Sequence, residues 1–385
     1  MKNSKNTSKN RSTVPRTRKR SAGMTVPFTD LTREWAYFEN AFLKGFKNFG
    51  RAGIYVSGSA LQKFERDFAD YNGYKYAVGL ATGMAALEVA LRAYGIKSGD
   101  EVITVANSAA ATALAISHTG AKPIFCDVKD DFLIDEEKIS GLITAKTRAI
   151  LPVHLFGKIC NLEAINRIAA VHNLIVIEDA CQAHGAKSKG AAGMNAKAFS
   201  FYPTKNLGAL GEGGLILTND KNIRDFAVSY RDYGQTERYK HVIKGNNYRL
   251  SPLQCVFLDI KLQKIADFIA RRKIIAKKYI SALSGIKELK INGFDGSAAY
   301  HLFVIRVLND KRDDLRAYLE NKGIATLVHY PTAIYDQLCY REEYPKLTLE
   351  KTEAFQTEIL SLPCYPFLTA AEQDYIIKKI KEYFS

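Results

Sequence analysis

The fold is decided by residues 174–185, which read Leu-Ile-Val-Ile-Glu-Asp-Ala-Cys-Gln-Ala-His-Gly. The first four form a continuous run of large apolar residues, which is typical of a strand buried on both faces of a parallel sheet. Ligands of such sheets bind beyond the carboxyl ends of the strands. Asp179, where the apolar run stops, is therefore a candidate for a buried anion that faces a cationic ligand. A carboxylate in this place can also merely cap or pair with a neighbour.

Short apolar runs alternate with helix-like stretches on both sides of this segment. The expected strands are 76–80, 101–105, 123–128, 148–153, 174–178, 198–201 and 214–217, and the expected helices are 84–94, 108–118, 162–172 and 222–230. This alternation predicts an α/β fold with a large, mostly parallel sheet. A helical stretch over 253–283 follows, and then a smaller C-terminal α/β unit. Its expected elements are a strand at 301–307 and helices at 311–322 and 370–384.

The net charge is concentrated at the N-terminus. The 385 residues include 55 Lys or Arg and 40 Asp or Glu, a formal charge of +15. Residues 1–22 hold eight of the basic side chains and no acid, so the remaining 47 basic and 40 acidic residues give +7. Residues 1–23 have too few apolar side chains to offset their ordering entropy, and we expect a disordered basic arm. A solvated arm is the main interpretation, and contact with nucleic acid or another polyanion is an alternative that is confined to this arm.

We expect three parts: the arm (1–23), a large domain over 24–265 and a small C-terminal domain over 266–385. Met24 opens the patterned region and is an alternative start. No apolar run approaches the roughly 18–20 residues of a membrane span, and the N-terminus lacks the apolar core of a secretory signal. The six cysteines are scattered, without the spacing of a zinc site, which favours a cytoplasmic location.

Two turns carry further candidate chemistry. Thr82-Gly83-Met84 joins an expected strand to an expected helix, whose free N–H groups and positive dipole end suit a phosphate. An ordinary strand-to-helix turn has the same residues. Lys205 lies between an aromatic strand and a glycine-rich loop, where a partly buried lysine can act as amine nucleophile or base. An isolated lysine is more often a surface charge.

Other nucleotide and metal chemistry loses support from the sequence. It holds no P-loop, no intact G-x-G-x-x-G and no H-E-x-x-H motif. ATP, NAD and zinc-protease chemistry are therefore disfavoured, and no metal ligands are predicted.

An ordered set of motifs resembles one family, the pyridoxal-phosphate (PLP) sugar aminotransferases of the DegT/DnrJ/EryC/StrS group. The resemblance extends from about Val26 to the C-terminus and implies the aspartate-aminotransferase-type fold of PLP-dependent transferases. The motifs are T-G-M-A-A-L (82–87), D-E-V-I (100–103), P-V-H-L-F-G (152–157), E-D-A-C-Q-A-H-G (178–185), S-F-Y-P-T-K-N-L-G (200–208), N-Y-R-L (247–250) and V-H-Y-P (328–331). Each motif is modest, but the ordered set is specific.

The resemblance implies a role for each residue on the cofactor side. Lys205 matches the lysine that forms a Schiff base with PLP and then moves the substrate proton. Asp179 matches the carboxylate on the pyridine nitrogen, which makes the ring an electron sink. Gln182 matches a residue beside the 3-oxygen of the ring. The residues implied at the phosphate are Thr82, Gly83, Met84 and Ser200.

The resemblance also implies partners. Asn247 matches an asparagine that reaches the phosphate from another subunit, which implies a homodimer with shared active sites. Arg249, His329 and Tyr330 lie in motifs that resemble substrate-side segments. An arginine there suits a carboxylate or a diphosphate through bidentate bonds, and His329 can equally be a packed core histidine.

The implied reaction moves an amino group, usually from glutamate, to a keto carbon of a nucleotide-linked sugar. Such amino sugars serve polysaccharides such as O-antigen. The motifs leave open whether the keto group is at C3 or C4, and which sugar and nucleotide are used.

Three positions depart from the family pattern. Met84 removes a side-chain hydroxyl from the phosphate turn. Ala109 stands where many members have an aromatic residue on the PLP ring, so another residue covers the ring or the affinity is lower. Cys181 replaces a common alanine, and we expect it to act as a small buried apolar residue.

Two other functions stay open. A PLP enzyme of the same fold can dehydrate a sugar, but the related dehydratases have His where this chain has Lys205. A regulatory or binding protein can act through the basic arm, but packing alone would not require both Asp179 and Lys205. The aminotransferase is therefore the leading hypothesis.

Overall fold

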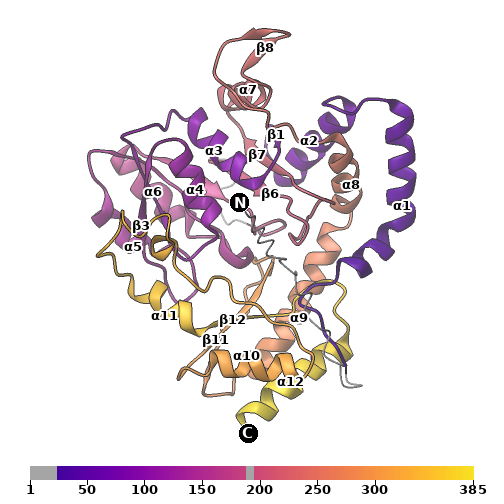
Figure 1. Ribbon diagram of the computed structural model, residues 1–385, viewed down its shortest axis with the longest axis vertical. Helices are drawn as coiled ribbons and strands as arrows, with labels where there is room; N and C mark the ends of the chain where they lie inside the picture. Colours follow the sequence, from indigo (N-terminus) through magenta and orange to yellow (C-terminus); the bar gives the residue numbers. More distant parts are fainter. Residues whose placement is uncertain (1–23, 188–194) are drawn as a thin grey trace, which may run out of the picture.

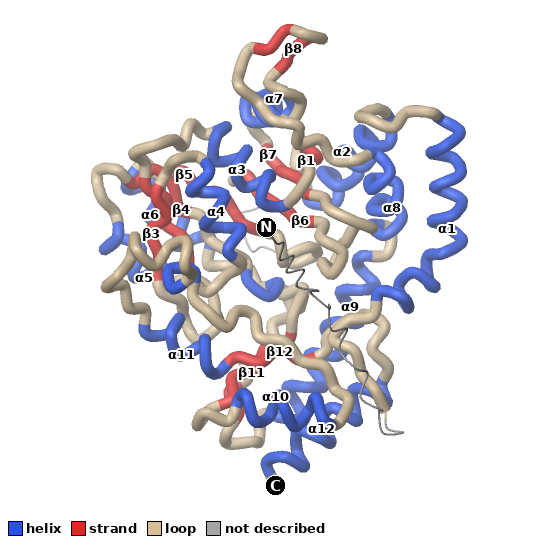
Figure 2. Tube along the Cα trace, viewed as in Figure 1, coloured by secondary structure: helices blue, strands red, loops and turns tan. Residues whose placement is uncertain are grey.

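The computed structural model describes residues 24–187 and 195–385, and the basic arm expected over 1–23 lies outside the described residues. Two sheets organise the described part of the chain (Figure 1; Figure 2). A seven-stranded sheet packs among helices, and a three-stranded sheet lies near the C-terminus. The expected α/β fold, with a large mostly parallel sheet and a smaller C-terminal unit, is confirmed.

The large sheet has the strand order β1-β7-β6-β5-β4-β2-β3. The five strands from β6 to β3 are parallel, whereas β7 is antiparallel to both of its neighbours. The strands are β1 (Tyr76–Leu80), β2 (Glu101–Val105), β3 (Lys122–Cys126), β4 (Thr147–Ile150), β5 (Ile175–Asp179), β6 (Ala196–Ser200) and β7 (Gly214–Thr218). All seven expected strands are present, with ends shifted by a few residues.

Helices cover both faces of this sheet, which explains its continuous apolar strands. On β7, Ile216 belongs to a core cluster with α3, whereas Leu215 and Leu217 belong to a second cluster with α2 and α8. The helices that pack around the sheet are α2 (Ser59–Asn72), α3 (Gly83–Ala93), α4 (Ala110–His118), α6 (Leu162–His172), α7 (Lys221–Tyr230) and α8 (Pro252–Leu262). The alternation of side chains along the strand therefore divides the core into two layers.

The helical stretch expected over 253–283 is confirmed, and it consists of two helices. α8 ends at Leu262, and α9 (Ile265–Leu283) begins three residues later. The first turns of α9 join the core under the large sheet, and its later turns join the core of the C-terminal unit. The break lets one segment of chain serve both cores.

The sequence analysis missed α1 (Leu31–Ala52) and α2. Asp30 caps α1 by accepting hydrogen bonds from the amides of Thr32 and Arg33, and Gly53 ends the helix at φ +67°. Figure 1 shows α1 beside α8 at the outer edge of the molecule. Its buried aromatic side chains join rings of α8 and α9 in one cluster, which contains Phe38, Phe42, Phe257 and Phe268.

The C-terminal unit is a small antiparallel sheet covered by helices. Its strands are β10 (Leu289–Lys290), β11 (Phe303–Val307) and β12 (Ile359–Leu362), and α10 (Arg312–Asn321) and α12 (Ala370–Phe384) pack against its core. A capping box formed by Thr369 and Glu372 starts α12. Arg33 of α1 donates two hydrogen bonds to Glu372, at 2.8 and 2.7 Å, and holds its pKa down to about 2.

The remaining elements are short, apart from one nine-residue helix. They are α5 (Glu136–Ile139), α11 (Glu350–Glu358), the hairpin strands β8 (Gln235–Glu237) and β9 (Lys240–His241), and 3-10 turns at Ser140–Leu142, Leu155–Gly157 and Ile334–Asp336. Across residues 24–187 and 195–385, no helix has both the length and the apolar character to cross a bilayer.

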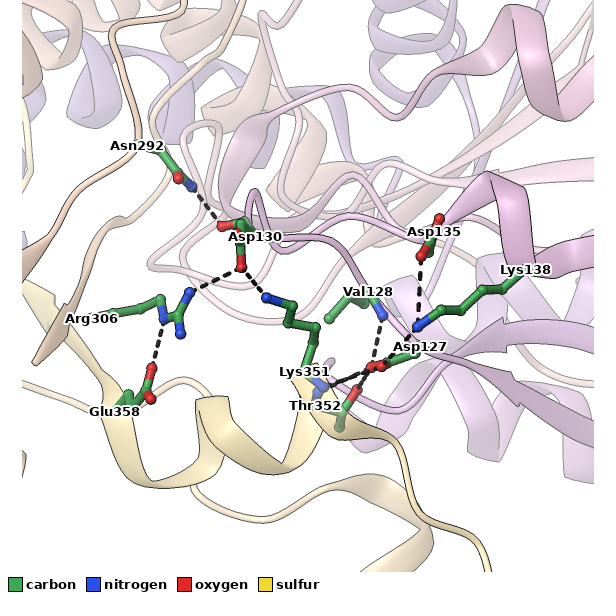
Figure 3. A network of polar contacts seen from close by, with 10 residues as sticks. All are labelled: Asp127, Val128, Asp130, Asp135, Lys138, Asn292, Arg306, Lys351, Thr352 and Glu358. Carbon is green, nitrogen blue, oxygen red and sulfur yellow. Dashed lines mark hydrogen bonds and ion pairs between the residues drawn. The ribbon is translucent and has the colours of Figure 1, made fainter. Parts of the chain in front are cut away.

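A buried carboxylate joins the two units (Figure 3). Asp127, directly after β3, accepts hydrogen bonds from the amides of Lys351 (3.1 Å) and Thr352 (3.0 Å) and from the Thr352 hydroxyl (2.9 Å). These amides belong to the first turn of α11, so Asp127 caps a helix that lies 225 residues further along the chain. Burial alone would raise the pKa of Asp127, but the bonds from Val128, Lys351 and Thr352 lower it overall.

A second set of contacts, made of ion pairs, lies beside this cap (Figure 3). Arg306 of β11 lies between Asp130 (3.0 Å) and Glu358 of α11 (2.6 Å), and Lys351 reaches the same oxygen of Asp130 at 2.8 Å. The Asp130 side chain is 61% exposed, so solvent screens its ion pairs. The cap at Asp127 is therefore the stronger of the two connections.

Asp127→Ala should lower the free energy of unfolding by about 2–3 kcal/mol, because α11 loses its charged cap. Asp130→Ala is the matched control and should cost less than about 1 kcal/mol. Urea titrations at neutral pH measure both. Because the folded pKa of Asp127 is lowered, its contribution is present above the ordinary carboxylate pKa and disappears as the pH falls through the lowered value. Equal losses in the two variants would contradict this assignment.

Candidate active site

The carboxyl ends of β5 and β6 place the first candidate group. Asp179 is the last residue of β5 and is 4% exposed. Its Oδ2 accepts a hydrogen bond from the Thr112 hydroxyl at 2.8 Å, and its Oδ1 accepts one from the amide of Cys181 at 3.1 Å. Thr112 lies in the first turn of α4, with Ser108 at 3.3 Å from its hydroxyl. The carboxylate is thus held in one rotamer by neighbours on both sides.

Lys205 lies on a tight turn that follows β6. Its amide donates a hydrogen bond to the carbonyl of Tyr202 at 2.9 Å. The amide of Ala209, at the end of the turn, donates one to the carbonyl of Phe201 at 2.8 Å. A Cβ on Gly208 would lie 2.2 Å from the carbonyl oxygen of Pro203, so the turn requires glycine there.

The amine of Lys205 has an unusual environment. Burial lowers the pKa of the Lys205 ammonium, and the nearby Cys181 and Asp179 oppose that shift. No hydrogen bond or ion pair of its Nζ is found within the part of the chain that the structure describes. A lysine of this kind has a larger neutral fraction than a surface lysine and is available to react.

The start of α3 forms an anion cradle beside these groups. Thr82 caps the helix by accepting from the amide of Ala85 at 3.0 Å, which leaves the first-turn amides of Gly83 and Met84 without an intrahelical acceptor. A Cβ on Gly83 would lie 2.5 Å from Cβ of Ser200, so the helix start packs directly on the end of β6. Free amides, a helix dipole and the Ser200 hydroxyl form a site that suits a phosphate.

Gln182 and Tyr330 form the opposite wall. Gln182 accepts from the amide of Phe156 at 2.8 Å and donates to the Tyr330 hydroxyl at 3.2 Å. Burial, helped by the charge of Asp179, raises the pKa of Tyr330 to about 12. The phenol therefore stays protonated near neutral pH and can donate a hydrogen bond to a ligand.

His329 lies near the amine as well. Its Nδ1 is 2.9 Å from the hydroxyl of Ser361, and its ring lies against Phe28. Burial, with a further contribution from Lys205, lowers the pKa of His329 to about 4. The residue is half-buried and faces the candidate site, so it is placed to contact a substrate in its neutral form.

The structure places Asn247 and Arg249 apart from this cluster. Asn247 is exposed, in a β-bridge with Asp232. The guanidinium of Arg249 pairs with Asp232 and lies over the ring of Tyr233, 4.9 Å from its centroid. Among residues 24–187 and 195–385, no hydrogen bond or ion pair joins these two side chains to the other candidate residues. The backbone of Arg249 forms a β-bridge with Leu80, two residues before Thr82.

The residues present fit PLP. A buried carboxylate suits a pyridinium, free amides beside a serine suit the phosphate, and an amine with a lowered pKa suits an aldehyde carbon. Gly83 is needed at the start of α3 because a Cβ there would collide with Ser200. The side chain of Met84 is half-buried against the core, so only its amide serves the cradle.

The sequence analysis missed the residues that orient this site. Thr112 was not assigned, although its place in the first turn after β2 puts it at the same sheet edge as Asp179. The Phe156 amide and Ser361 were also missed. The hydrogen bond from the Phe156 amide to Gln182 depends on the shape of a turn that no local sequence pattern predicts. Ser361 lies 32 residues from its partner His329.

Comparison with known proteins agrees with this geometry. Residues 37–381 match the DegT/DnrJ/EryC1/StrS aminotransferase family. The chain is 37% identical over 365 residues to dTDP-3-amino-3,4,6-trideoxy-alpha-D-glucose transaminase of Streptomyces venezuelae, covering 93% of this chain and 96% of that one. It is 38% identical over 364 residues to dTDP-3-amino-3,6-dideoxy-alpha-D-galactopyranose transaminase of Aneurinibacillus thermoaerophilus, covering 93% and 99%.

A solved structure is similar along almost the whole chain. The crystal structure of S. venezuelae DesV in complex with a ketimine intermediate superposes with a TM-score of 0.91 at 36% identity, covering 94% of this chain and 99% of that one. With the family match over 37–381, these similarities identify the relationship: the chain belongs to the DegT/DnrJ/EryC1/StrS aminotransferase family.

Proposed function

We propose that the chain is a PLP-dependent aminotransferase that moves an amino group from glutamate to a keto carbon of a nucleotide-linked deoxysugar. The observation that carries the proposal is the meeting of Lys205 and Asp179 beside the cradle at Gly83. Both transaminases described above are named for dTDP-linked amino sugars, which supports the same substrate class here.

Each residue of the site has a task in this reaction. PLP, when bound, supplies an electron sink that carries the amino group between two substrates. Asp179 holds the proton on the pyridine nitrogen, and Thr112 fixes its rotamer. Lys205 takes the proton from the substrate carbon on its Nζ and returns it, for which its lowered pKa suits it. Gln182, joined to Tyr330, orients the oxygen side of the ring.

The site of amination is C3 in our proposal. The names of both relatives place the amino group on the third carbon of a dideoxy or trideoxy sugar. His329 and Tyr330, which lie beside Lys205 and Gln182, are the residues we assign to the sugar. The product would enter the synthesis of a polysaccharide such as O-antigen in the cytoplasm.

A second subunit completes the site in our proposal. Asn247 is exposed and cannot serve the cradle of its own chain in this conformation, so we assign its amide to the phosphate of a partner active site. Arg249, two residues on, would then face the substrate of that site. We place the domain boundary at residues 265 and 266, at the start of α9, whose first turns still pack in the core of the large sheet and whose later turns belong to the C-terminal core.

Lys205→Ala should abolish covalent attachment of PLP and lower the rate of transamination by about 10³-fold, because the proton carrier is lost. Borohydride reduction and peptide mass spectrometry should find PLP on Lys205 of the wild type and on no lysine of the variant. Lys221→Ala, at an exposed lysine paired with Asp225, is the control and should leave both readouts unchanged. A wild-type protein that PLP cannot reconstitute would sink the proposed function.

Thr112→Val should lower kcat/KM by about 10-fold, because Asp179 loses the hydrogen bond that fixes it. Thr119→Val is matched, since Thr119 is also buried and its hydroxyl donates a hydrogen bond to the carbonyl of Ile116 at 2.7 Å. The control should change thermal stability but leave kcat/KM close to that of the wild type. An equal kinetic loss in both variants would show that Thr112 acts only through folding.

A panel of keto-sugar nucleotides tests the substrate. With glutamate as donor, we expect 3-keto dTDP-deoxysugars to give an amino sugar and an equal amount of 2-oxoglutarate, as seen by mass spectrometry and an enzyme-coupled assay. The 4-keto isomers serve as the comparison. Turnover of 4-keto sugars alone would overturn C3 and leave the aminotransferase assignment intact.

A further inference from the structure

A small cavity lies beside the turn that carries Lys205. Its volume is about 10 Å³, which is room for one water molecule. Four parts of the chain form its walls: the segment that leads into α1, the turn after β6, one side chain of α9 and the loop after β12. The residues used below are Glu34, Asn206, Arg272 and Tyr365.

Three of these residues each carry a buried polar atom that has no hydrogen-bond partner in the described part of the chain. Oδ1 of Asn206, Nε of Arg272 and the hydroxyl of Tyr365 are buried, and none has a partner among residues 24–187 and 195–385. The exposed fractions of the three residues are 5%, 5% and 2%. Buried polar atoms are nearly always hydrogen-bonded to protein or to ordered water, and the three residues that carry these atoms line one cavity. One ligand in that cavity would satisfy all three.

Hydrogen bonds to other parts of the chain determine which atoms of Asn206 and Arg272 are left without a partner. The amide nitrogen of Asn206 donates to the carbonyl of Ala299 at 3.1 Å, so its oxygen must be the atom left over. Nη1 of Arg272 donates to the carbonyls of Tyr300, His301 and Cys364, which leaves Nε as a free donor. The cavity therefore has one acceptor, one donor and one hydroxyl that can do either.

We propose that this cavity is a binding site for one ordered water molecule. The water accepts a hydrogen bond from Nε of Arg272, donates one to Oδ1 of Asn206 and makes the third with the hydroxyl of Tyr365. Three partners are the usual number for a buried water. The site joins the residue next to Lys205 with α9 and with the loop after β12, and so ties the Lys205 turn to the C-terminal unit.

The charges around the cavity favour water over an anion. Arg272 and Lys205 both line the cavity, but burial lowers the pKa of the Lys205 ammonium. Asp30 and Glu34 line the cavity as well, and Glu34 pairs with the buried ammonium of Lys261. An anion would meet the carbonyl oxygen of Asn206 and two carboxylates. A neutral ligand that both donates and accepts meets none of these repulsions.

A crystal structure of the full chain at a resolution that shows ordered waters tests the site directly. We expect one density peak at about 2.6–3.2 Å from each of the three atoms. A cavity without density, or one filled by a protein side chain, would overturn the proposal. So would a structure in which the three groups bond to other protein atoms.

Tyr365→Phe gives an independent test on the protein without cofactor, and it does not depend on activity. If the hydroxyl bonds a buried water, its removal should lower the melting temperature by about 2 °C. If the hydroxyl has no partner, its removal should leave the melting temperature unchanged or raise it, and that result would overturn the proposal. The sign of the shift separates the two cases.

Tyr340→Phe is the matched control. Tyr340 is 3% exposed, and its hydroxyl bonds that of Ser117 at 2.8 Å, so its loss calibrates one direct hydrogen bond. A fall in melting temperature for Tyr365→Phe similar to that of Tyr340→Phe supports the water site. The two outcomes are independent of whether the chain aminates a sugar.

Discussion

The active site depends on a close approach of two stretches of backbone. A Cβ on Gly214, at the start of β7, would lie 2.0 Å from the carbonyl oxygen of Thr82, and one on Gly83 would lie 2.5 Å from Cβ of Ser200. Any side chain at either glycine would force α3 away from β6 and β7. Because Lys205 follows β6 at the same sheet edge, this contact brings the phosphate cradle and the reactive amine within reach of one cofactor.

The Lys205 turn is supported from outside the large sheet. Lys261 of α8 is fully buried, and its ammonium donates to the carbonyl of Gly208 at 2.6 Å and pairs with Glu34 of α1. A buried cation is costly unless it is paired, so this arrangement requires both partners. Asn206 holds the same turn to Ala299. The N-terminal helix is thus part of the support of the Lys205 turn.

The sequence predicted what local pattern encodes. Apolar β-branched runs gave the seven strands, and the motifs gave Lys205 and Asp179 as a pair. The contacts that orient these groups could not be predicted from local pattern, because they join residues far apart in the sequence. Thr112 lies 67 residues from Asp179, and Thr352 lies 225 residues from Asp127. α1 could have been predicted, because its cap signals, Asp30 and Gly53, and apolar residues at helical spacing are all present in the sequence. The role that we propose for Asn247 needs a second chain, which no pattern within one sequence describes.

Burial rather than nearby positive charge sets the state of Lys205. Three histidines surround the amine, and burial lowers the pKa of His184 to about 3, that of His329 to about 4 and that of His301 well below its usual value. Near neutral pH all three are therefore uncharged. The amine meets only the acidic neighbours Cys181 and Asp179, which favour its protonated form, against burial, which favours the neutral one. Burial therefore gives the amine a larger neutral fraction than a surface lysine has, which suits the role we propose for it.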